Sequence, residues 1–200
     1  MYRLVIFDLD GTLADASVMV PSDARIFDDM REAVIELHSH GIALAVATTM
    51  PTASAAAIVS SWDVGSLFLT VRGAYVPCTK GDLIRLCMLD VGAAPAETLM
   101  VGDSETDMIG AGRNGVGFVA APGSGDFERW DSRAYRPSDG MALVRFVLGF
   151  HGSRCHNYIT NPDSSACSRR PADSPRTTRV LSCCRRPTAK ATTGAGPSSS

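Results

Sequence analysis

Long hydrophobic runs are missing from this 200-residue chain. A helix needs about 20 consecutive apolar residues to span a bilayer, and the apolar run closest to the N-terminus, Leu4–Phe7, ends at Asp8. A secretory signal peptide would need an apolar stretch of about 7–15 residues at this place. We therefore expect a cytoplasmic protein that has no membrane partner.

Cysteines at metal-binding spacing are also missing. None of the six Cys forms a CxxC pair, and their spacings fit no common zinc pattern. Structural disulfides are typical of oxidising compartments. We therefore expect the cysteines of a cytoplasmic chain to be reduced thiols. The sequence also shows no internal repeats.

Lysine is scarce, and charge is unevenly distributed. The chain has two Lys, Lys80 and Lys190, against 17 Arg. Residues 1–150 contain 11 basic and 19 acidic side chains, whereas residues 151–200 contain eight basic and two acidic ones. The second segment is rich in Ser, Pro, Thr, Arg and Ala, so it cannot bury enough apolar surface to offset its ordering entropy. We predict a folded domain over residues 1–150 and a basic, disordered tail over residues 151–200.

The basic tail has two interpretations. It could contact nucleic acid or another anion, or it could be an unselected extension, for instance from a shifted reading frame. The acidic domain gives no independent support for nucleic-acid binding, so nucleic acid is not an expected partner.

Short apolar runs alternate with helical patterns in the first 150 residues. Strands are predicted at 2–7, 42–47, 67–71, 98–101 and 116–120, with a short edge strand at 134–136. Helices are predicted at about 27–40, 51–62, 81–89, 106–113 and 141–148. This alternation is typical of a doubly wound, Rossmann-like α/β fold with a mostly parallel five-stranded sheet covered on both faces. Such sheets bind ligands at the carboxyl ends of their strands.

Polar side chains follow three of these strands, namely Asp8, Asp10, Thr48, Asp103 and Asp107. Four carboxylates at one sheet edge would repel one another, but they would suit a hard divalent cation, and Mg²⁺ is the usual choice beside phosphate. Lys80, before the third predicted helix, and the Thr48 hydroxyl would donate to phosphate oxygens. An aspartate in such a site can act as a nucleophile. Taken singly, Asp8 and Asp10 suit a turn and Asp103 a helix cap; the ordered set favours a site.

Four segments resemble, in order, the motifs of the haloacid dehalogenase superfamily: Asp8-Leu9-Asp10-Gly11-Thr12, Thr48, Lys80 and the stretch GDSETD at 102–107. The resemblance covers about residues 1–149. The stretches DGTLAD and GDSETD are most similar to the phosphoglycolate phosphatase-like group.

This resemblance implies a Mg²⁺-dependent phosphatase that hydrolyses phosphate monoesters through an aspartyl-phosphate. Asp8 would attack phosphorus and bind Mg²⁺. Asp10 would protonate the leaving oxygen, then activate water, and would bind the metal through its backbone carbonyl. Asp103 and Asp107 would complete the Mg²⁺ site.

The resemblance also implies how the phosphoryl group is held. Thr48 and Lys80 would hold it, helped by backbone N–H groups near Leu9 and Thr49. The full implied set of substrate contacts is Leu9, Gly11, Thr12, Thr49 and Ser104.

The motif spacing leaves no room for the lid, or cap domain, that many members of this superfamily carry. The intervals from Thr12 to Thr48 and from Thr48 to Lys80 are largely filled by predicted strands and helices. Only the loop 13–25 could partly cover the site, and its lining candidates are Asp15, Ser17, Met19 and Val20. Without a lid, either a second copy of the chain in a homo-oligomer closes the site or the substrate is large enough to cover it.

The expected partner is a small phosphorylated metabolite of open identity. Two alternatives remain at this stage. The domain could bind phosphate and metal without turnover, as a regulatory module, or it could be a phosphatase for a macromolecular substrate.

Overall fold

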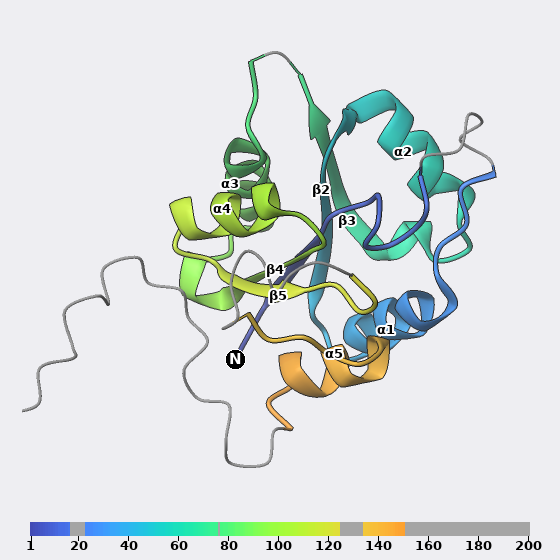
Figure 1. Ribbon diagram of the computed structural model, residues 1–200, viewed down its shortest axis with the longest axis vertical. Helices are drawn as coiled ribbons and strands as arrows, with labels where there is room; N and C mark the ends of the chain where they lie inside the picture. The colour runs from blue at the N-terminus through green and yellow to red at the C-terminus, as the bar shows by residue number, and fades with distance from the viewer. Residues whose placement is uncertain (17–22, 76, 125–133, 151–200) are drawn as a thin grey trace, which may run out of the picture. The chain divides into compact units, whose positions relative to one another are not determined.

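The computed structural model describes residues 1–16, 23–75, 77–124 and 134–150. These residues contain a five-stranded sheet of β1 (Leu4–Phe7), β2 (Ala43–Pro51), β3 (Phe68–Ala74), β4 (Thr98–Gly102) and β5 (Gly117–Ala120). The strand order is β3-β2-β1-β4-β5, and every neighbouring pair is parallel (Figure 1). The predicted α/β fold is therefore confirmed, with β1 at the centre of the sheet.

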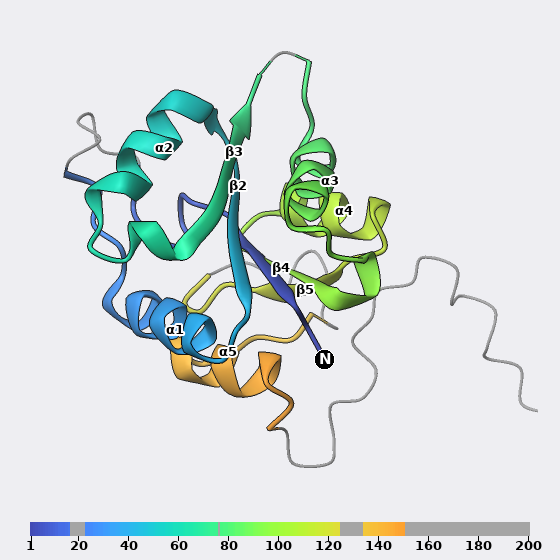
Figure 2. The same cartoon turned by 180° about the vertical axis from the view of Figure 1, so that it is seen from behind.

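Helices cover both faces of the sheet (Figure 2). Residues of α1 (Asp28–Ser39), α2 (Thr52–Ser61) and α5 (Gly140–Val147) pack against Val5 and Phe7. Residues of α3 (Lys80–Val91) and α4 (Glu105–Arg113) pack against Leu4 and Ile6 on the other face. Because successive strand residues point to opposite faces and both faces are buried, β1 is a continuous apolar run in the sequence.

The strand β2 is longer than the sequence indicated. It continues from the predicted end at residue 47 through Thr48 to Pro51, and its register with β3 shifts between Thr48 and Pro51. The backbone of β3 lies very close to the start of α2 at Gly73, where a Cβ would lie 2.4 Å from the Thr52 backbone nitrogen. The chain thus turns sharply into α2 beside the carboxyl end of β2.

The predicted edge strand at 134–136 is smaller than expected. Tyr135 forms a single parallel bridge with Val119, and its carbonyl oxygen accepts a hydrogen bond from the Ala120 backbone N–H at 3.0 Å.

Two capping boxes fix the starts of the helices nearest the carboxyl edge of the sheet. Thr79 caps α3, exchanging hydrogen bonds with Asp82. Ser104 caps α4 in the same way with Asp107. Because a capping box satisfies backbone donors that the first helical turn leaves unpaired, each box sets where its helix begins. The next residue after Thr79 is Lys80, so the first box places that lysine at the start of α3.

No separate lid domain is formed by the described residues. The interval from Thr12 to Thr48 contains α1, and that from Thr48 to Lys80 contains α2 and β3. The lining candidates Ser17, Met19 and Val20, and the predicted tail 151–200, lie outside the described residues. No helix in the described part of the chain is long and apolar enough to cross a membrane.

Candidate active site

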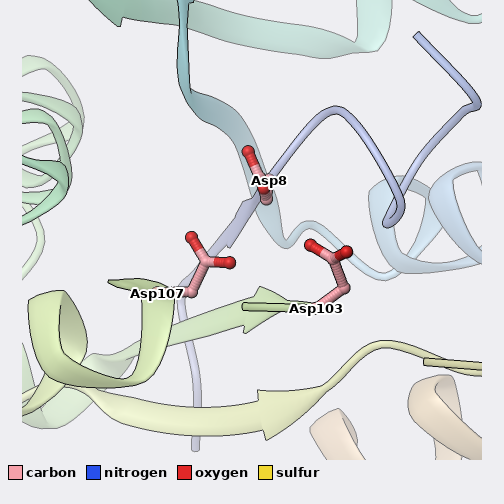
Figure 3. A group of neighbouring side chains, drawn as sticks. All are labelled: Asp8, Asp103 and Asp107. Atoms are coloured by element: carbon pink, nitrogen blue, oxygen red, sulfur yellow. The ribbon is translucent and has the colours of Figure 1, made fainter. Parts of the chain in front are cut away.

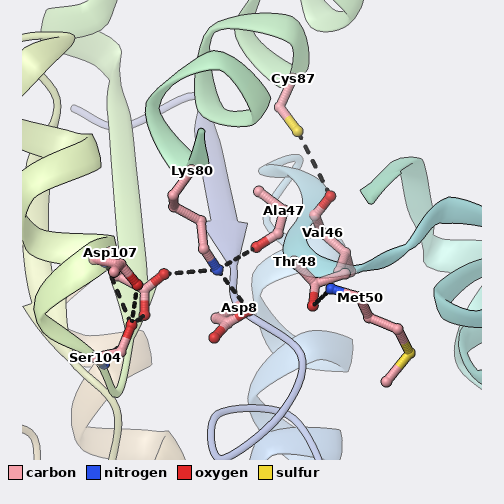
Figure 4. A network of polar contacts seen from close by, with 10 residues as sticks. Asp8, Val46, Ala47, Thr48, Met50, Lys80, Cys87, Ser104 and Asp107 are labelled. Atoms are coloured by element: carbon pink, nitrogen blue, oxygen red, sulfur yellow. Dashed lines mark hydrogen bonds and ion pairs between the residues drawn. The ribbon is translucent and has the colours of Figure 1, made fainter. Parts of the chain in front are cut away.

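The Lys80 ammonium lies between two carboxylates, one directly after the strand β1 and the other on the helix α4. Its Nζ is 2.7 Å from Asp8 Oδ1, at the end of β1, and 2.7 Å from Asp107 Oδ1, in the first turn of α4 (Figure 4). Nζ also donates to the Ala47 carbonyl oxygen at 2.9 Å. The ammonium thus contacts oxygen atoms from three separate segments, two by hydrogen bonds and one as an ion pair, although Lys80 is only 5% exposed.

Three carboxylates converge beside this lysine. Asp8, Asp103 and Asp107 each offer an oxygen atom, and these atoms lie within 4.8 Å of one another (Figure 3). Asp107 is fully buried, Asp8 is 8% exposed and Asp103 is half-buried. The cluster lies where β1 and β4 end, because these neighbouring strands run parallel.

Burial and mutual repulsion disfavour the charged forms of the carboxyl groups in this cluster. Burial raises the pKa of the Asp8 carboxyl to about 7, Lys80 partly offsets this, and Asp107 adds to it. Burial and the neighbouring Asp107 also raise the pKa of Asp103. Burial alone would lower the pKa of Lys80, but the two paired carboxylates outweigh burial and raise it. A single lysine thus leaves the cluster short of positive charge.

Glycines allow the carboxylates to approach the neighbouring backbone. A Cβ at Gly11, whose φ is +74°, would lie 2.2 Å from Asp103 Oδ2. A Cβ at Gly102 would lie 2.5 Å from the Asp107 carboxyl carbon. Gly11 and Gly102 therefore leave space that the Asp103 and Asp107 carboxylates occupy.

Asp10 does not join the carboxylate cluster through its side chain. Its Oδ1 accepts a hydrogen bond of 2.7 Å from the Ala16 backbone N–H, and the residue is exposed at the mouth of the site. The loop that follows β1 thus holds Asp10 beside the cluster and open to solvent. The structure brings together three of the four predicted acidic side chains.

The other predicted contacts lie around this centre. Thr48 is 2% exposed, and its Oγ1 accepts a hydrogen bond of 3.2 Å from the Met50 backbone N–H. Thr12 is 1% exposed, and its Oγ1 is a buried atom without a hydrogen-bond partner. Ser104 donates to Asp107 Oδ2 at 2.5 Å. Leu9 is buried, whereas Gly11 and Thr49 are exposed.

One group at the site carried no sequence signal. The Ala47 carbonyl helps to hold Lys80, but a backbone acceptor is present at every residue and so cannot be singled out from a pattern.

Cys87 lies behind β2, where its thiol contacts the Val46 carbonyl oxygen at 3.6 Å. Burial raises the pKa of Cys87 to about 12, so this thiol is protonated at neutral pH and is not a nucleophile.

Comparison with known proteins identifies the family of this chain. Residues 22–121 match the haloacid dehalogenase-like hydrolase family over half of the chain. The chain belongs to this family. The matched residues include Thr48, Lys80, Asp103 and Asp107, and they begin after Asp8 and Asp10. Membership in the haloacid dehalogenase-like hydrolases confirms the resemblance seen in the motifs.

A curated relative and two solved structures extend the comparison. A 5′-nucleotidase from Pseudomonas aeruginosa is 32% identical over 133 residues, covering 64% of this chain and 60% of that protein. The chain therefore spans less than two thirds of the relative's length. A predicted phosphatase from Clostridium acetobutylicum superposes with a TM-score of 0.65 at 19% identity, covering 74% of this chain and 99% of that chain. A predicted phosphoglycolate phosphatase from Haemophilus somnus superposes with a TM-score of 0.60 at 16% identity, covering 75% of this chain and 98% of that chain. Both structures share the fold of this chain.

Proposed function

We propose that this protein is a Mg²⁺-dependent phosphatase that hydrolyses small phosphate monoesters through an aspartyl-phosphate on Asp8. The observation that carries the proposal is the convergence of Asp8, Asp103 and Asp107 around Lys80 at the carboxyl edge of the sheet. Family membership and the 5′-nucleotidase relative support the same chemistry.

The residues present fit a magnesium ion. Their three carboxylate oxygens are the hard ligands that Mg²⁺ prefers, and a single ammonium, that of Lys80, pairs with only two of the three carboxylates. Asp8, Asp103 and Asp107 would hold the ion, with the Asp10 backbone carbonyl as a further ligand. When bound, Mg²⁺ would supply positive charge against the negative charge on the phosphoryl oxygens.

The first chemical step uses Asp8 and Asp10. An Asp8 carboxylate oxygen attacks phosphorus, and the bond between phosphorus and the ester oxygen breaks. The leaving oxygen takes the proton of the Asp10 carboxylic acid, which makes it an alcohol rather than an alkoxide. Lys80 and the Thr48 hydroxyl donate hydrogen bonds to the phosphoryl oxygens and hold the group in line.

The second step regenerates the enzyme. Asp10, now a carboxylate, takes a proton from a water molecule whose oxygen attacks phosphorus of the aspartyl-phosphate. The bond between phosphorus and the Asp8 oxygen breaks, releasing inorganic phosphate and the Asp8 carboxylate. The open position of Asp10 supports both roles, because the residue must reach the leaving group and then water.

The proposed substrate class is a small phosphorylated metabolite, and nucleoside 5′-monophosphates come first because of the nucleotidase relative. Phosphoglycolate comes second, because one structural neighbour is a predicted phosphoglycolate phosphatase. A second copy of the chain closing the site remains part of the proposal, because the described residues form no lid.

The test is hydrolysis of p-nitrophenyl phosphate by the purified full chain, with Mg²⁺ and with EDTA. Mg²⁺-dependent release of p-nitrophenol is expected, and Asp8→Asn should abolish it while the circular dichroism spectrum stays unchanged. The control is Glu36→Gln, which also neutralises a carboxylate but at a half-buried position beside His40, near the end of α1 and toward the amino ends of the strands. It should keep full activity.

Other outcomes separate the alternatives. Magnesium binding without phosphate release would favour a non-catalytic metal- and phosphate-binding domain. Weak release from small esters together with rapid release from a phosphoprotein would favour a macromolecular substrate. Full activity in Asp8→Asn would remove the proposed nucleophile. A panel of nucleoside monophosphates and phosphoglycolate, compared by kcat/KM, would then rank the substrates.

A further inference from the structure

Lys80 and Asp107 lie on two helices, α3 and α4, that run side by side (Figure 1). These helices approach each other closely at Gly81 and Gly110. A Cβ at Gly110 of α4 would lie 3.1 Å from the Gly81 backbone nitrogen and 3.2 Å from Lys80 Cγ. Any side chain at residue 110 would therefore push Gly81 or Lys80 away by a few tenths of an ångström. The aliphatic stem of Lys80 therefore lies across Gly110, one turn beyond Asp107.

An asparagine joins the two helices at the same place. The Asn114 side-chain Nδ2, at the end of α4, donates to the Gly81 carbonyl oxygen at 2.9 Å and to the Gly110 carbonyl oxygen at 2.8 Å. Both partners are carbonyl oxygens, which only accept, so the amide must present its NH₂ group to them. One amide hydrogen of Asn114 therefore binds a carbonyl oxygen of α3, and the other binds a carbonyl oxygen of α4.

This contact acts on the residue next to Lys80. Gly81 follows Lys80 in the first turn of α3, and the Asn114 amide ties that turn to α4. Asp107 lies on α4, so the same tie fixes the distance between the lysine and its buried partner. Within the described part of the chain, the Asn114 amide donates to these two backbone carbonyls rather than to the carboxylate cluster.

We propose that Asn114 is a positioning residue that holds the first turn of α3 against α4 and so keeps Lys80 between Asp8 and Asp107. Its catalytic consequence rests on the proposed phosphatase function. Its geometric consequence, the shielding of the Lys80 ammonium, does not. No sequence motif points to this role, because Asn114 lies seven residues beyond Asp107 and its partners are backbone atoms.

The test measures how fast an amine-acylating reagent, sulfosuccinimidyl acetate, modifies Lys80 in the folded full chain. The chain has only two lysines, so peptide mass spectrometry can follow Lys80 with Lys190 as the internal reference. Asn114→Asp keeps the size of the side chain but removes both donors. It should raise the rate ratio of Lys80 to Lys190 by about thirtyfold, the factor expected when two ordinary hydrogen bonds are lost.

Two further variants sharpen the test. Gly110→Ala favours the helix in local terms, yet its methyl group would press on Gly81 and Lys80, so it should also raise the acylation of Lys80. Asp139→Ala removes the cap of α5, where Asp139 accepts from the Ala142 backbone N–H, on the other face of the sheet. It lowers stability without touching α3 or α4, and it should leave the acylation ratio unchanged.

The kinetic readout is the split between kcat and KM. With p-nitrophenyl phosphate and saturating Mg²⁺, Asn114→Asp should lower kcat about ten- to a hundredfold, the range for a catalytic group displaced by roughly 1 Å. Asp139→Ala should leave kcat unchanged at a temperature where it is folded.

The outcomes are distinct. Unchanged acylation in both Asn114→Asp and Gly110→Ala would overturn the positioning role, whether or not the protein is a phosphatase. An equal rise in Asp139→Ala would also overturn it, because general loosening would then explain the effect. If Asn114→Asp does not fold, Asn114→Ala and Gly110→Ala carry the same measurement. A wild-type chain without phosphatase activity would refute the proposed function while the acylation result still decided the role of Asn114.

Discussion

Gly11 and Asp103 are in such close contact that no side chain can stand between them. A Cβ on Gly11 would lie 2.2 Å from Asp103 Oδ2, well inside contact distance, and Gly11 also has a φ of +74°. The loop after β1 and the loop after β4 are therefore fitted to each other at the carboxylate cluster. Residue 11 must therefore be glycine for two reasons, its positive φ and the lack of space for a Cβ beside Asp103.

Gly11→Ala tests the steric requirement, with Gly41→Ala as a matched control. Gly41 has a φ of +75° and nothing within 4 Å of its added Cβ, so it carries the backbone cost alone, about 1–2 kcal/mol. Gly11→Ala should lower the free energy of unfolding by about 1–3 kcal/mol more, because the methyl group displaces Asp103. It should also weaken Mg²⁺ binding measured by calorimetry, whereas Gly41→Ala should not. Equal Mg²⁺ affinities in the two variants would contradict this assignment.

Lys80→Met tests the importance of the buried ammonium to the fold. Removing the cation leaves Asp8 and Asp107 buried without their partner, and breaking such a pair costs about 3–5 kcal/mol. Denaturant unfolding in EDTA should show a loss of that size at pH 8. Lys190→Met, the same substitution at the other lysine, is the control and should leave the unfolding midpoint unchanged. A Lys80→Met variant as stable as wild type would show that the pair does not stabilise the fold.

Asp10→Asn tests whether Asp10 supplies a proton to the leaving group. An alkyl alcohol leaves poorly without a proton, whereas p-nitrophenolate is a good leaving group. General acid catalysis contributes about 10²–10⁴-fold. The first-step rate should therefore fall by about that factor for a nucleoside monophosphate and much less for p-nitrophenyl phosphate, measured by rapid-quench detection of the released group. The same fall with both substrates would assign Asp10 another role.

Asp82→Asn should make the stability of the protein less dependent on pH in the acidic range. Hydrogen bonds from the Thr79 backbone N–H and hydroxyl lower the pKa of the Asp82 carboxyl below 3.8. A carboxyl whose pKa is lowered by folding stabilises the protein above its unfolded pKa, and this contribution is lost as pH falls through the folded pKa. The wild type should thus have the higher thermal midpoint at pH 6, and the difference should shrink below about pH 4. A constant difference from pH 6 to pH 3 would contradict the capping box.

The sequence predicted the fold because its strands are buried on both faces and so appear as short continuous apolar runs. The strand-end aspartates were found for the same reason, since Asp8 and Asp103 directly follow such runs. The direction of the Asp10 side chain could not be predicted, because it depends on the Ala16 N–H in the following loop. The extension of β2 to Pro51 was missed, since Thr48-Thr49 resembles a strand end and the pairing with Gly73 comes from a distant segment.

The sequence predicted that Lys80 lies at the site, but not which side chains it contacts there. Its scarcity and its place before a helix indicated a site residue, but nothing local indicated that it would bridge two carboxylates. That arrangement depends on how closely α3 approaches α4, and the glycines and Asn114 that set this approach have no recognisable pattern. Side-chain geometry that depends on the packing of two helices lies beyond periodicity and motifs.

The central place of β1 has a consequence for synthesis on the ribosome. β1 is made before the other described strands, yet one of its two neighbours, β4, pairs Thr98 with Leu4 and so appears only after β2 and β3 have been translated. Until then one edge of an entirely apolar strand has no partner, a condition that favours association between nascent chains. The carboxylates of Asp8 and Asp103 are kept apart for the same interval, so the emerging polypeptide cannot capture a divalent ion with both of them before β4 has docked.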